Sequence, residues 1–470
     1  MSYTGARFLL IFFPCLLVVY WLFHKRPLIQ NAVLLIGSLL FYASFSKRNT
    51  AVLLAVIVIS WLAGNQIAKN RKALIPSVIL VFIPLLFFKY GRTMLGLWYV
   101  LMPLGISFFT LQAASYLFDI AGGKIEPETN LLNYALYVSF FPTIVSGPIH
   151  KSREFLPEER REKTLSYRDA VSGCLVFLYG VFLKMVIADR IALFTAPVFQ
   201  YYSGYEGGVI LVAALLYSAE IYFDFYGYTC MVSGIARLLG YRLKENFFQP
   251  YFAVSIADFW KRWHMSLTSW LTEYVYFPLG GNRRGRLRKY LNIMIVFLVS
   301  ALWHGTGMQF AVWGLLHGIY RIAEELLAPV KEKVLNRMKI DSSRTGWKVL
   351  ERIRVYLLVT FAWVFFRAQD VPAAWGFLTQ LFHHFSLHVF FDGTLFQLTL
   401  DETHFRVLIL CILCAAAVSC YREKGVRAED LFDENLIVRW TLILVLLFAV
   451  LIFGVYGPSY DAASFIYANF

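Results

Sequence analysis

The sequence predicts an all-α polytopic membrane protein with roughly ten to thirteen transmembrane or re-entrant helices. Of its 470 residues, 59% are hydrophobic and only 16% are charged, whereas soluble domains usually carry about a quarter charged residues. The mean hydropathy is +0.59. Apolar blocks also recur along the whole chain, and many approach the roughly 20 residues that a helix needs to cross a bilayer.

Each apolar block is expected to form one helix, and the first is expected to be a retained helix rather than a cleaved signal peptide. The blocks are Phe8–Phe23, Ala32–Phe45, Ala51–Ile67, Leu74–Phe88, Leu95–Ile120, Ala170–Ile187, Val209–Phe223, Leu291–Trp303, Met308–Ile322, Ile353–Phe366, Val407–Ser419 and Trp440–Tyr456. A further block, Leu131–Ile149, is expected to enter the membrane and return, with breaks at Pro142 and Pro148. The polar stretches between blocks are too short for separate domains, so we expect a single membrane-embedded domain over residues 1–470.

The positions of the basic residues behind the net charge of +14 match a membrane topology. Its basic clusters lie between apolar blocks, which is typical of the cytoplasmic loops of a multi-pass protein. They are Lys69–Lys72, Lys151–Arg168, Arg283–Lys289, Lys331–Arg354 and Arg422–Arg427. This placement argues against a nucleic-acid surface. The 6 cysteines show no pair of CxxC motifs, so no metal site is expected.

Two carboxylates lie within the apolar stretch YSAEIYFDFYGY. Glu220 and Asp224 are four residues apart, so both project from one face of a helix. They have two interpretations. They bind a cation or relay protons, as in a secondary transporter or channel, or they form a structural ion pair with Lys184 or Arg237.

A strongly amphipathic segment follows, SIADFWKRWHMSLTSWLTEYVYFPLGGNRRG, which we expect to be one interfacial or re-entrant helix that ends at the PLGG break. At a helical pitch, seven apolar side chains form a stripe that includes Trp263. His264 lies at the border between this stripe and the polar face, and Asn282 follows the break.

A third polar feature is SALWHGTGMQFAVWGLLHG. His304 follows Trp303 at the end of an apolar block and precedes Gly305 and Gly307, which we expect to loosen the backbone. His317 lies on the next block. An imidazole can act as a general base at neutral pH, and acyl transfer to a hydroxyl needs such a base. The alternative for either histidine is a core residue bonded to a backbone carbonyl.

These segments resemble the membrane-bound O-acyltransferase superfamily, and most closely the branch with bacterial alginate O-acetylases and other polysaccharide or cell-wall O-acetylases. The D-alanyl transfer membrane protein of teichoic acid modification is a more distant relative. The matching motifs run in the family's order. They are MPLGISFFTLQAASY, YVSFFPTIVSGPI, IYFDFYGYTCM, ENFFQPYFAVSIADFWKRWHMSLTSWL, YFPLGGNRRG, WHG, WGLLHG and the closing SFIYANF.

The resemblance implies a ring of helices around a central chamber, where a cytoplasmic acyl thioester meets a hydroxyl acceptor presented from outside. It implies that His304 is catalytic and that His264 lines the chamber. We expect five further residues to contact substrate, namely His317, Trp303, Asp224, Trp263 and Asn282. Two departures from the family pattern, Cys230 and Thr272-Glu273, leave both histidines in place but weaken any acceptor specificity taken from alginate acetylation.

The expected function is therefore O-acyl transfer in the bacterial plasma membrane, with no bound cofactor. Acetyl is the expected group, and acetyl-CoA or another acyl thioester, including an acyl carrier protein, is the expected donor. The acceptor is expected to be a cell-envelope polysaccharide, reached directly or through a partner of the SGNH-hydrolase type. The alternative is a secondary transporter or channel that uses Glu220 and Asp224.

Overall fold

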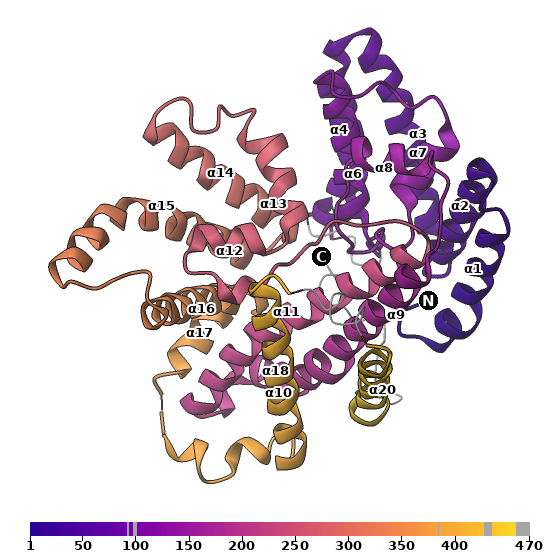
Figure 1. Cartoon of the computed structure of the whole chain (residues 1–470). Coiled ribbons are helices and arrows are strands. Elements are labelled where there is room, and N and C mark those ends of the chain that lie inside the picture. The colour runs from indigo at the N-terminus through magenta and orange to yellow at the C-terminus, as the bar shows by residue number, and fades with distance from the viewer. Residues whose placement is uncertain (92–93, 97–100, 384, 427–434, 457–470) are drawn as a thin grey trace. The chain divides into compact units, whose positions relative to one another are not determined.

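The computed structural model describes residues 1–91, 94–96, 101–383, 385–426 and 435–456, and within these ranges it contains helices and loops but no strand (Figure 1). The closing motif SFIYANF lies outside the described residues. Contacts divide the chain into two compact units. The described part of the first comprises residues 1–181 and 228–245, and the second comprises residues 182–227 and 246–456. The helix α11 (Gly207–Leu238) runs from the second unit into the first.

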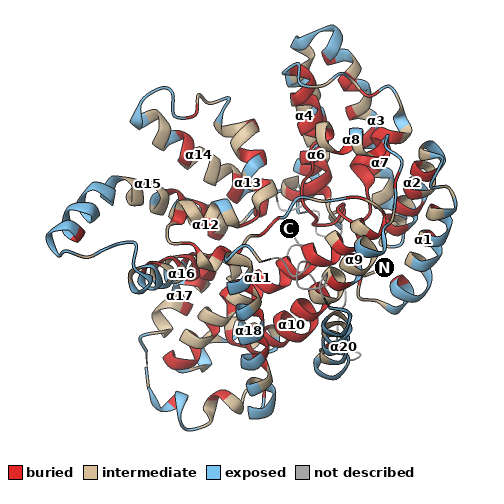
Figure 2. Cartoon of the chain, in the orientation of Figure 1, coloured by how far each residue is buried: buried red, intermediate tan, exposed pale blue. Residues whose placement is uncertain are grey.

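The first unit holds the N-terminal helices. They are η1 (Phe8–Phe12), α1 (Phe13–Leu22), α2 (Pro27–Ala43), α3 (Lys47–Lys69), η2 (Arg71–Ala73), α4 (Leu74–Leu86), η3 (Phe87–Gly91), α6 (Ile106–Ala121), α7 (Leu131–Ser139), α8 (Ser152–Glu159) and α9 (Tyr167–Val181). Helix α6 packs against α3 and α4, and α7 packs against α2. Both α6 and α7 are almost entirely buried (Figure 2). The core of this unit therefore lies around α6 and α7.

The second unit holds the later helices. They are η4 (Phe182–Ala188), α10 (Asp189–Gln200), η5 (Tyr202–Gly204), most of α11, η6 (Pro250–Phe252), α12 (Ile256–Arg262), α13 (Met265–Leu271), η7 (Thr272–Tyr276), α14 (Arg286–His304), α15 (Met308–Arg337), α16 (Thr345–Arg367), α17 (Val371–Gln380), η8 (His388–Phe390), η9 (Thr394–Phe396), α18 (Glu402–Glu423) and α20 (Leu436–Phe453). Helix α15 packs against both α14 and α16.

The helices confirm the prediction of a polytopic membrane protein. Among the described residues, six helical stretches are long and apolar enough to cross a membrane, namely Lys47–Lys69, Arg71–Gly91, Tyr167–Gln200, Gly207–Leu238, Glu402–Glu423 and Leu436–Phe453. Helix α20 illustrates why these helices need a lipid environment. Its span has a mean hydropathy of 2.8, and only 6% of it is buried within the protein. So much exposed apolar surface on one helix is compatible with lipid and not with water.

Most of the remaining predicted blocks also fall within helices. The block Leu95–Ile120 is an exception, because its described residues before Ile106 form turns and loop and α6 begins at Ile106. Phe8–Leu22, Pro27–Ala43 and Ile106–Ala121 are shorter apolar helices, and the last three predicted blocks before residue 370 are the apolar parts of α14, α15 and α16. The predicted break in Leu131–Ile149 is confirmed, since α7 ends at Ser139 and residues 140–151 form turns and loop.

Two glycines on α15 determine how closely it packs against α14. A Cβ atom on Gly314 would lie 2.7 Å from the carbonyl oxygen of Phe297, and one on Gly318 would lie 2.8 Å from the sulfur of Met294. Small residues spaced by four let two helix backbones approach each other closely. The GLLHG part of the motif therefore has a packing role, and it brings the side chains of α15 onto the end of α14.

Candidate active site

His304 is the last residue of α14 and is only 2% exposed. Its ring is enclosed by three other rings at edge-to-face angles, with centroid distances of 4.8 Å to Trp303, 5.1 Å to Trp313 and 5.2 Å to Phe366. These rings come from α14, α15 and α16. An imidazole in such surroundings is shielded from bulk water, so electrostatic interactions with a substrate are strengthened there.

The glycine after His304 serves a different purpose from the one expected. Gly305 is extended, with φ of −167° and ψ of 171°, a conformation open to any residue. However, a Cβ atom there would lie 2.0 Å from the ring of Phe310. Gly305 is therefore needed for close packing at the end of α14, which is a reason for glycine other than the expected one.

His264 lies at a break within the amphipathic segment. The predicted single helix from Ser255 onward was wrong, because α12 ends at Arg262 and α13 begins at Met265. Between them, His264 adopts left-handed backbone angles, with φ of 41° and ψ of 54°. Histidine, asparagine and aspartate are the residues other than glycine that most often tolerate this region.

A distant asparagine explains the break. The side-chain oxygen of Asn246 accepts hydrogen bonds from the Ser266 backbone N–H at 3.1 Å and from the Ser266 hydroxyl at 2.9 Å. The same oxygen lies 3.2 Å from Nδ1 of His264. Since a carbonyl oxygen only accepts, Nδ1 must carry the ring proton. His264 is thus held in one tautomer, with its lone pair on Nε2.

Trp303 connects the two histidines. Its ring centroid lies 4.8 Å from that of His304 and 6.0 Å from that of His264. Phe225 on α11 packs against the other histidine, with its centroid 4.9 Å from His264. The structure therefore brings His264 together with Trp303 and His304, although the two histidines are 40 residues apart in the sequence, in one buried cluster of the second unit.

His317 and Trp263 join this cluster through further rings. The indole N–H of Trp260 donates to Nδ1 of His317 at 3.3 Å, and the centroid of His317 lies 5.2 Å from that of Trp313. Trp263 contacts Trp363 at 5.1 Å, and Trp363 stacks on Trp313 at 5.8 Å. The alternative for His317 was a core histidine bonded to a backbone carbonyl. In the structure its ring is instead hydrogen-bonded to the indole of Trp260.

Asp224 lies in a separate buried cluster of charged groups. The ammonium of Lys184 lies 2.6 Å from Asp224 and 2.8 Å from Asp189. Glu220, one turn earlier on α11, accepts a hydrogen bond from the hydroxyl of Thr195. The predicted pairing with Lys184 is therefore confirmed, whereas Arg237 donates to Ser172 in the first unit. An ion path needs carboxylates that exchange partners readily, and these contacts favour the structural role.

Asn282 is not close to the histidines. It is exposed in the turn that precedes α14, while His304 ends this helix of 19 residues. At 1.5 Å per residue, α14 separates them by about 28 Å. A neighbouring asparagine that we did not predict holds the turn, since Asn292 is fully buried and donates to the carbonyl of Gly281 at 2.9 Å.

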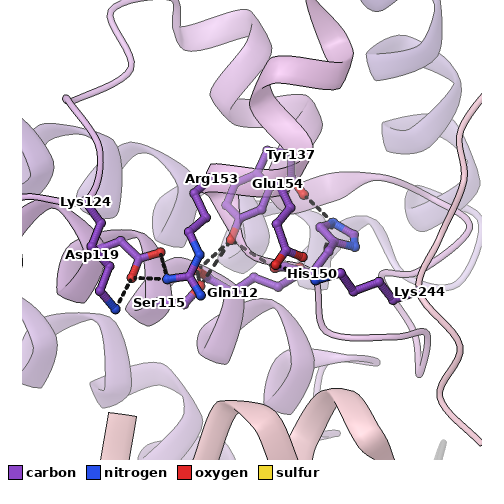
Figure 3. Close-up of polar contacts among 9 residues, drawn as sticks. All are labelled: Gln112, Ser115, Asp119, Lys124, Tyr137, His150, Arg153, Glu154 and Lys244. Atoms are coloured by element: carbon purple, nitrogen blue, oxygen red, sulfur yellow. Dashed lines mark hydrogen bonds and ion pairs between the residues drawn. The ribbon is translucent and has the colours of Figure 1, made fainter. Parts of the chain in front are cut away.

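The first unit contains a polar network that we also did not predict (Figure 3). Gln112 on α6 lies 3.0 Å from Nε2 of His150, and the hydroxyl of Tyr137 donates to the backbone oxygens of Gln112 at 2.9 Å and of His150 at 3.2 Å. Ion pairs flank it, between Arg153 and Asp119 and between Lys244 and Glu154. The sequence signal that could have revealed this network is Gln112, a glutamine within an apolar block. The network ties the 140–151 loop to α6 and α7.

Comparisons with known proteins identify the family. The family model described as MBOAT, the membrane-bound O-acyltransferase family, matches residues 125–366, which include every candidate site residue. The chain is 33% identical over 405 residues to the "Probable alginate O-acetylase AlgI" of Pseudomonas aeruginosa, covering 81% of this chain and 75% of that protein.

Two other relatives carry different names. The chain is 34% identical to the peptidoglycan O-acetyltransferase of Helicobacter pylori over 418 residues, which are 79% of this chain and 78% of that protein. It is 28% identical to the teichoic acid D-alanyltransferase of Bacillus subtilis over 228 residues, or 46% of this chain and 57% of that protein. With its membrane helices and buried histidines, the chain belongs to the membrane-bound O-acyltransferase family and is an O-acyltransferase.

Proposed function

We propose that this enzyme transfers an acetyl group from a cytoplasmic thioester to a hydroxyl of a cell-envelope polysaccharide in the bacterial plasma membrane. The observation that carries the proposal is the pair of buried histidines linked by Trp303, with centroid distances of 4.8 and 6.0 Å. The relatives named for alginate and for peptidoglycan acetylation support a glycan acceptor and an acetyl group.

In the proposed mechanism, His304 is the general base. As the acceptor oxygen attacks the thioester carbonyl carbon, its proton passes to the imidazole, and the imidazolium then protonates the departing thiolate. General-base catalysis contributes about 10²–10⁴-fold in rate. The Nδ1 proton of His264 is directed to Asn246, which leaves Nε2 as an acceptor. In this role, Nε2 would orient the thioester by accepting a hydrogen bond from an N–H of the donor's chain.

The donor in this proposal is acetyl-CoA or an acetylated carrier protein, because both present the acetyl group as a thioester. The acceptor is either the glycan itself or a partner protein of the SGNH-hydrolase type that passes the acetyl group on. Both alternatives place the same chemistry at His304. They differ only in which hydroxyl enters the site.

The proposal is tested with the purified full-length protein reconstituted in vesicles. Acetyl-CoA or an acetylated carrier protein is supplied with alginate or peptidoglycan fragments, and both free thiol and alkali-labile acetate on the glycan are measured. Thiol release that depends on the acceptor supports the function. Absence of transfer with both donors and all acceptors, together with solute uptake by the vesicles, would favour the transporter alternative.

Replacing His264 by asparagine is expected to slow transfer at least tenfold while the protein stays folded. Asparagine tolerates the left-handed backbone and keeps a donor for Asn246, so the change isolates the imidazole. Turnover is to be compared with the amount of folded protein in membranes. A loss of activity that merely follows a loss of folded protein would show that His264 is structural.

The basic segment Arg283–Lys289, which comprises the turn before α14 and the first residues of that helix, is available to bind a charged donor. Arg283, Arg284 and Arg286 are exposed, whereas Lys289 is held 2.6 Å from Glu325 and lowers the pKa of that carboxyl through this hydrogen bond. We expect Arg283→Gln, Arg284→Gln and Arg286→Gln together to raise KM for acetyl-CoA severalfold in detergent. The effect should shrink with salt, since about 0.1 M salt screens charges beyond about 10 Å. An unchanged KM would assign the loop to lipid anchoring alone.

A further inference from the structure

Two buried N–H groups on α15 have no hydrogen-bond acceptor among the residues that the structure describes. They are Nε1 of Trp313 and Nε2 of His317. Since Nδ1 of His317 accepts the indole N–H of Trp260 at 3.3 Å, the ring proton of His317 must be on Nε2. Both side chains are 0% exposed, so neither donor is satisfied by bulk water.

The two donors lie on one face of the helix and beside the proposed base. Residues 313 and 317 are four apart, which places them one turn apart on the same side of α15. The ring centroids of Trp313 and His317 are 5.2 Å apart, and that of Trp313 is 5.1 Å from that of His304. Both donors therefore belong to the cluster of rings that contains the proposed base.

Leaving them unpaired is costly. A buried donor without an acceptor costs about 1–3 kcal/mol, and two of them occur within one turn of α15. The indole of Trp260 in the same aromatic cluster avoids this cost, because it donates to His317. The indole N–H of Trp363 also has no acceptor among the described residues, but it is Trp313 whose ring contacts His304, at a centroid distance of 5.1 Å. An acceptor supplied by a ligand would satisfy the donors of Trp313 and His317.

We infer that Trp313 and His317 bind the carbonyl oxygen of the thioester and stabilise the negative charge that develops on it. This inference rests on the proposed function. When the acceptor oxygen bonds to the carbonyl carbon, its proton passes to His304 and the carbonyl electron pair moves onto the oxygen. The two N–H groups donate to that oxyanion. On collapse the C=O bond re-forms, the C–S bond breaks, and the thiolate takes the proton from the imidazolium.

The surroundings suit such a site. The rings around the two donors are aromatic, with Phe366 at 5.3 Å from Trp313 and Phe297 at 6.0 Å from His317. Fixed donors in an apolar, water-poor region stabilise an oxyanion more strongly than the same donors in water. A neutral His317, held by Trp260, donates without adding a full charge to the apolar region.

The experiment compares variants that remove one N–H and keep a similar shape. Trp313→Phe and His317→Leu are each expected to lower kcat about 10²–10³-fold with little change in KM, as for loss of one oxyanion donor. His317→Gln restores an amide N–H and should recover part of the loss. Trp61→Phe is the control, since it removes an indole N–H of the first unit that donates to the backbone oxygen of Glu128 at 2.7 Å, and it should keep most of the activity.

A second measurement separates catalysis from packing. Two coenzyme A analogues are bound to the purified protein, the ketone in which a methylene replaces sulfur and S-ethyl coenzyme A, which lacks the carbonyl. Trp313→Phe should weaken binding of the ketone and leave binding of the thioether unchanged. Equal effects on both analogues, or a kcat within twofold of wild type, would overturn the inference. If the wild-type protein itself transfers no acetyl group, the proposed function fails first.

Discussion

Replacing His304 by alanine is expected to abolish acyl transfer, with a loss of about 10²–10⁴-fold in kcat from the missing general base, while the protein remains folded in membranes. The imidazole is 2% exposed and contacts three aromatic rings, so its removal leaves a cavity among these rings. The measurement is acetyl-dependent thiol release by the purified variant, normalised to folded protein.

The matched control for this variant is His150→Ala. His150 is also buried, but it lies in the first unit, where it contacts Gln112 and stacks on Phe155 at 4.5 Å. The folded fraction of this variant should keep its turnover. Wild-type turnover by His304→Ala, or an equal loss in both variants, would contradict the assignment of His304 as the base.

Replacing Lys184 by methionine is expected to destabilise the protein by about 3–5 kcal/mol, because it leaves a buried charge without its partner. Lys184 is 3% exposed and is the cation between Asp224 and Asp189, at 2.6 and 2.8 Å. The apolar surroundings raise the cost of a carboxylate that loses its facing cation. The measurement is the thermal unfolding midpoint in detergent, together with the yield of protein in membranes.

A second substitution tests the cause. Adding Asp224→Leu to Lys184→Met removes the uncompensated charge, so the double variant should be more stable than the single one. Asp189 keeps some contact with solvent, with 11% of its side chain exposed. If Lys184→Met had wild-type stability and its vesicles took up solute, the result would instead support the interpretation of Asp224 as part of an ion site.

Much of the architecture could be read from local patterns. The apolar blocks became helices because, in lipid, a helix satisfies all its backbone hydrogen bonds within one segment. Block boundaries such as Leu74 and Leu131 coincide with helix starts. The proline and glycine breaks after residue 139 also appeared where predicted, since these residues cannot continue a regular helix.

The break at His264 could not be read in this way. The stripe of apolar residues from Phe259 to Tyr274 continues at a helical pitch across it, and no proline or glycine interrupts the segment there. The helix ends because Asn246, 18 residues earlier, accepts from the residues on the far side of the break. A tertiary hydrogen bond overrides a local helical pattern, and no periodicity within the segment records it.

The sequence by itself determined the helices, the membrane as their solvent, and the histidines that carry the proposed chemistry, because these follow from the hydropathy of single segments and from motifs. Only the tertiary structure decided which of these residues meet. It joined His304, His264 and His317 through Trp303 and Trp313, assigned Asp224 to Lys184, and separated Asn282 from His304 by the length of α14. The reason is physical: proximity across helices depends on how closely backbones such as those at Gly314 and Gly318 approach, and packing is a property of pairs of segments.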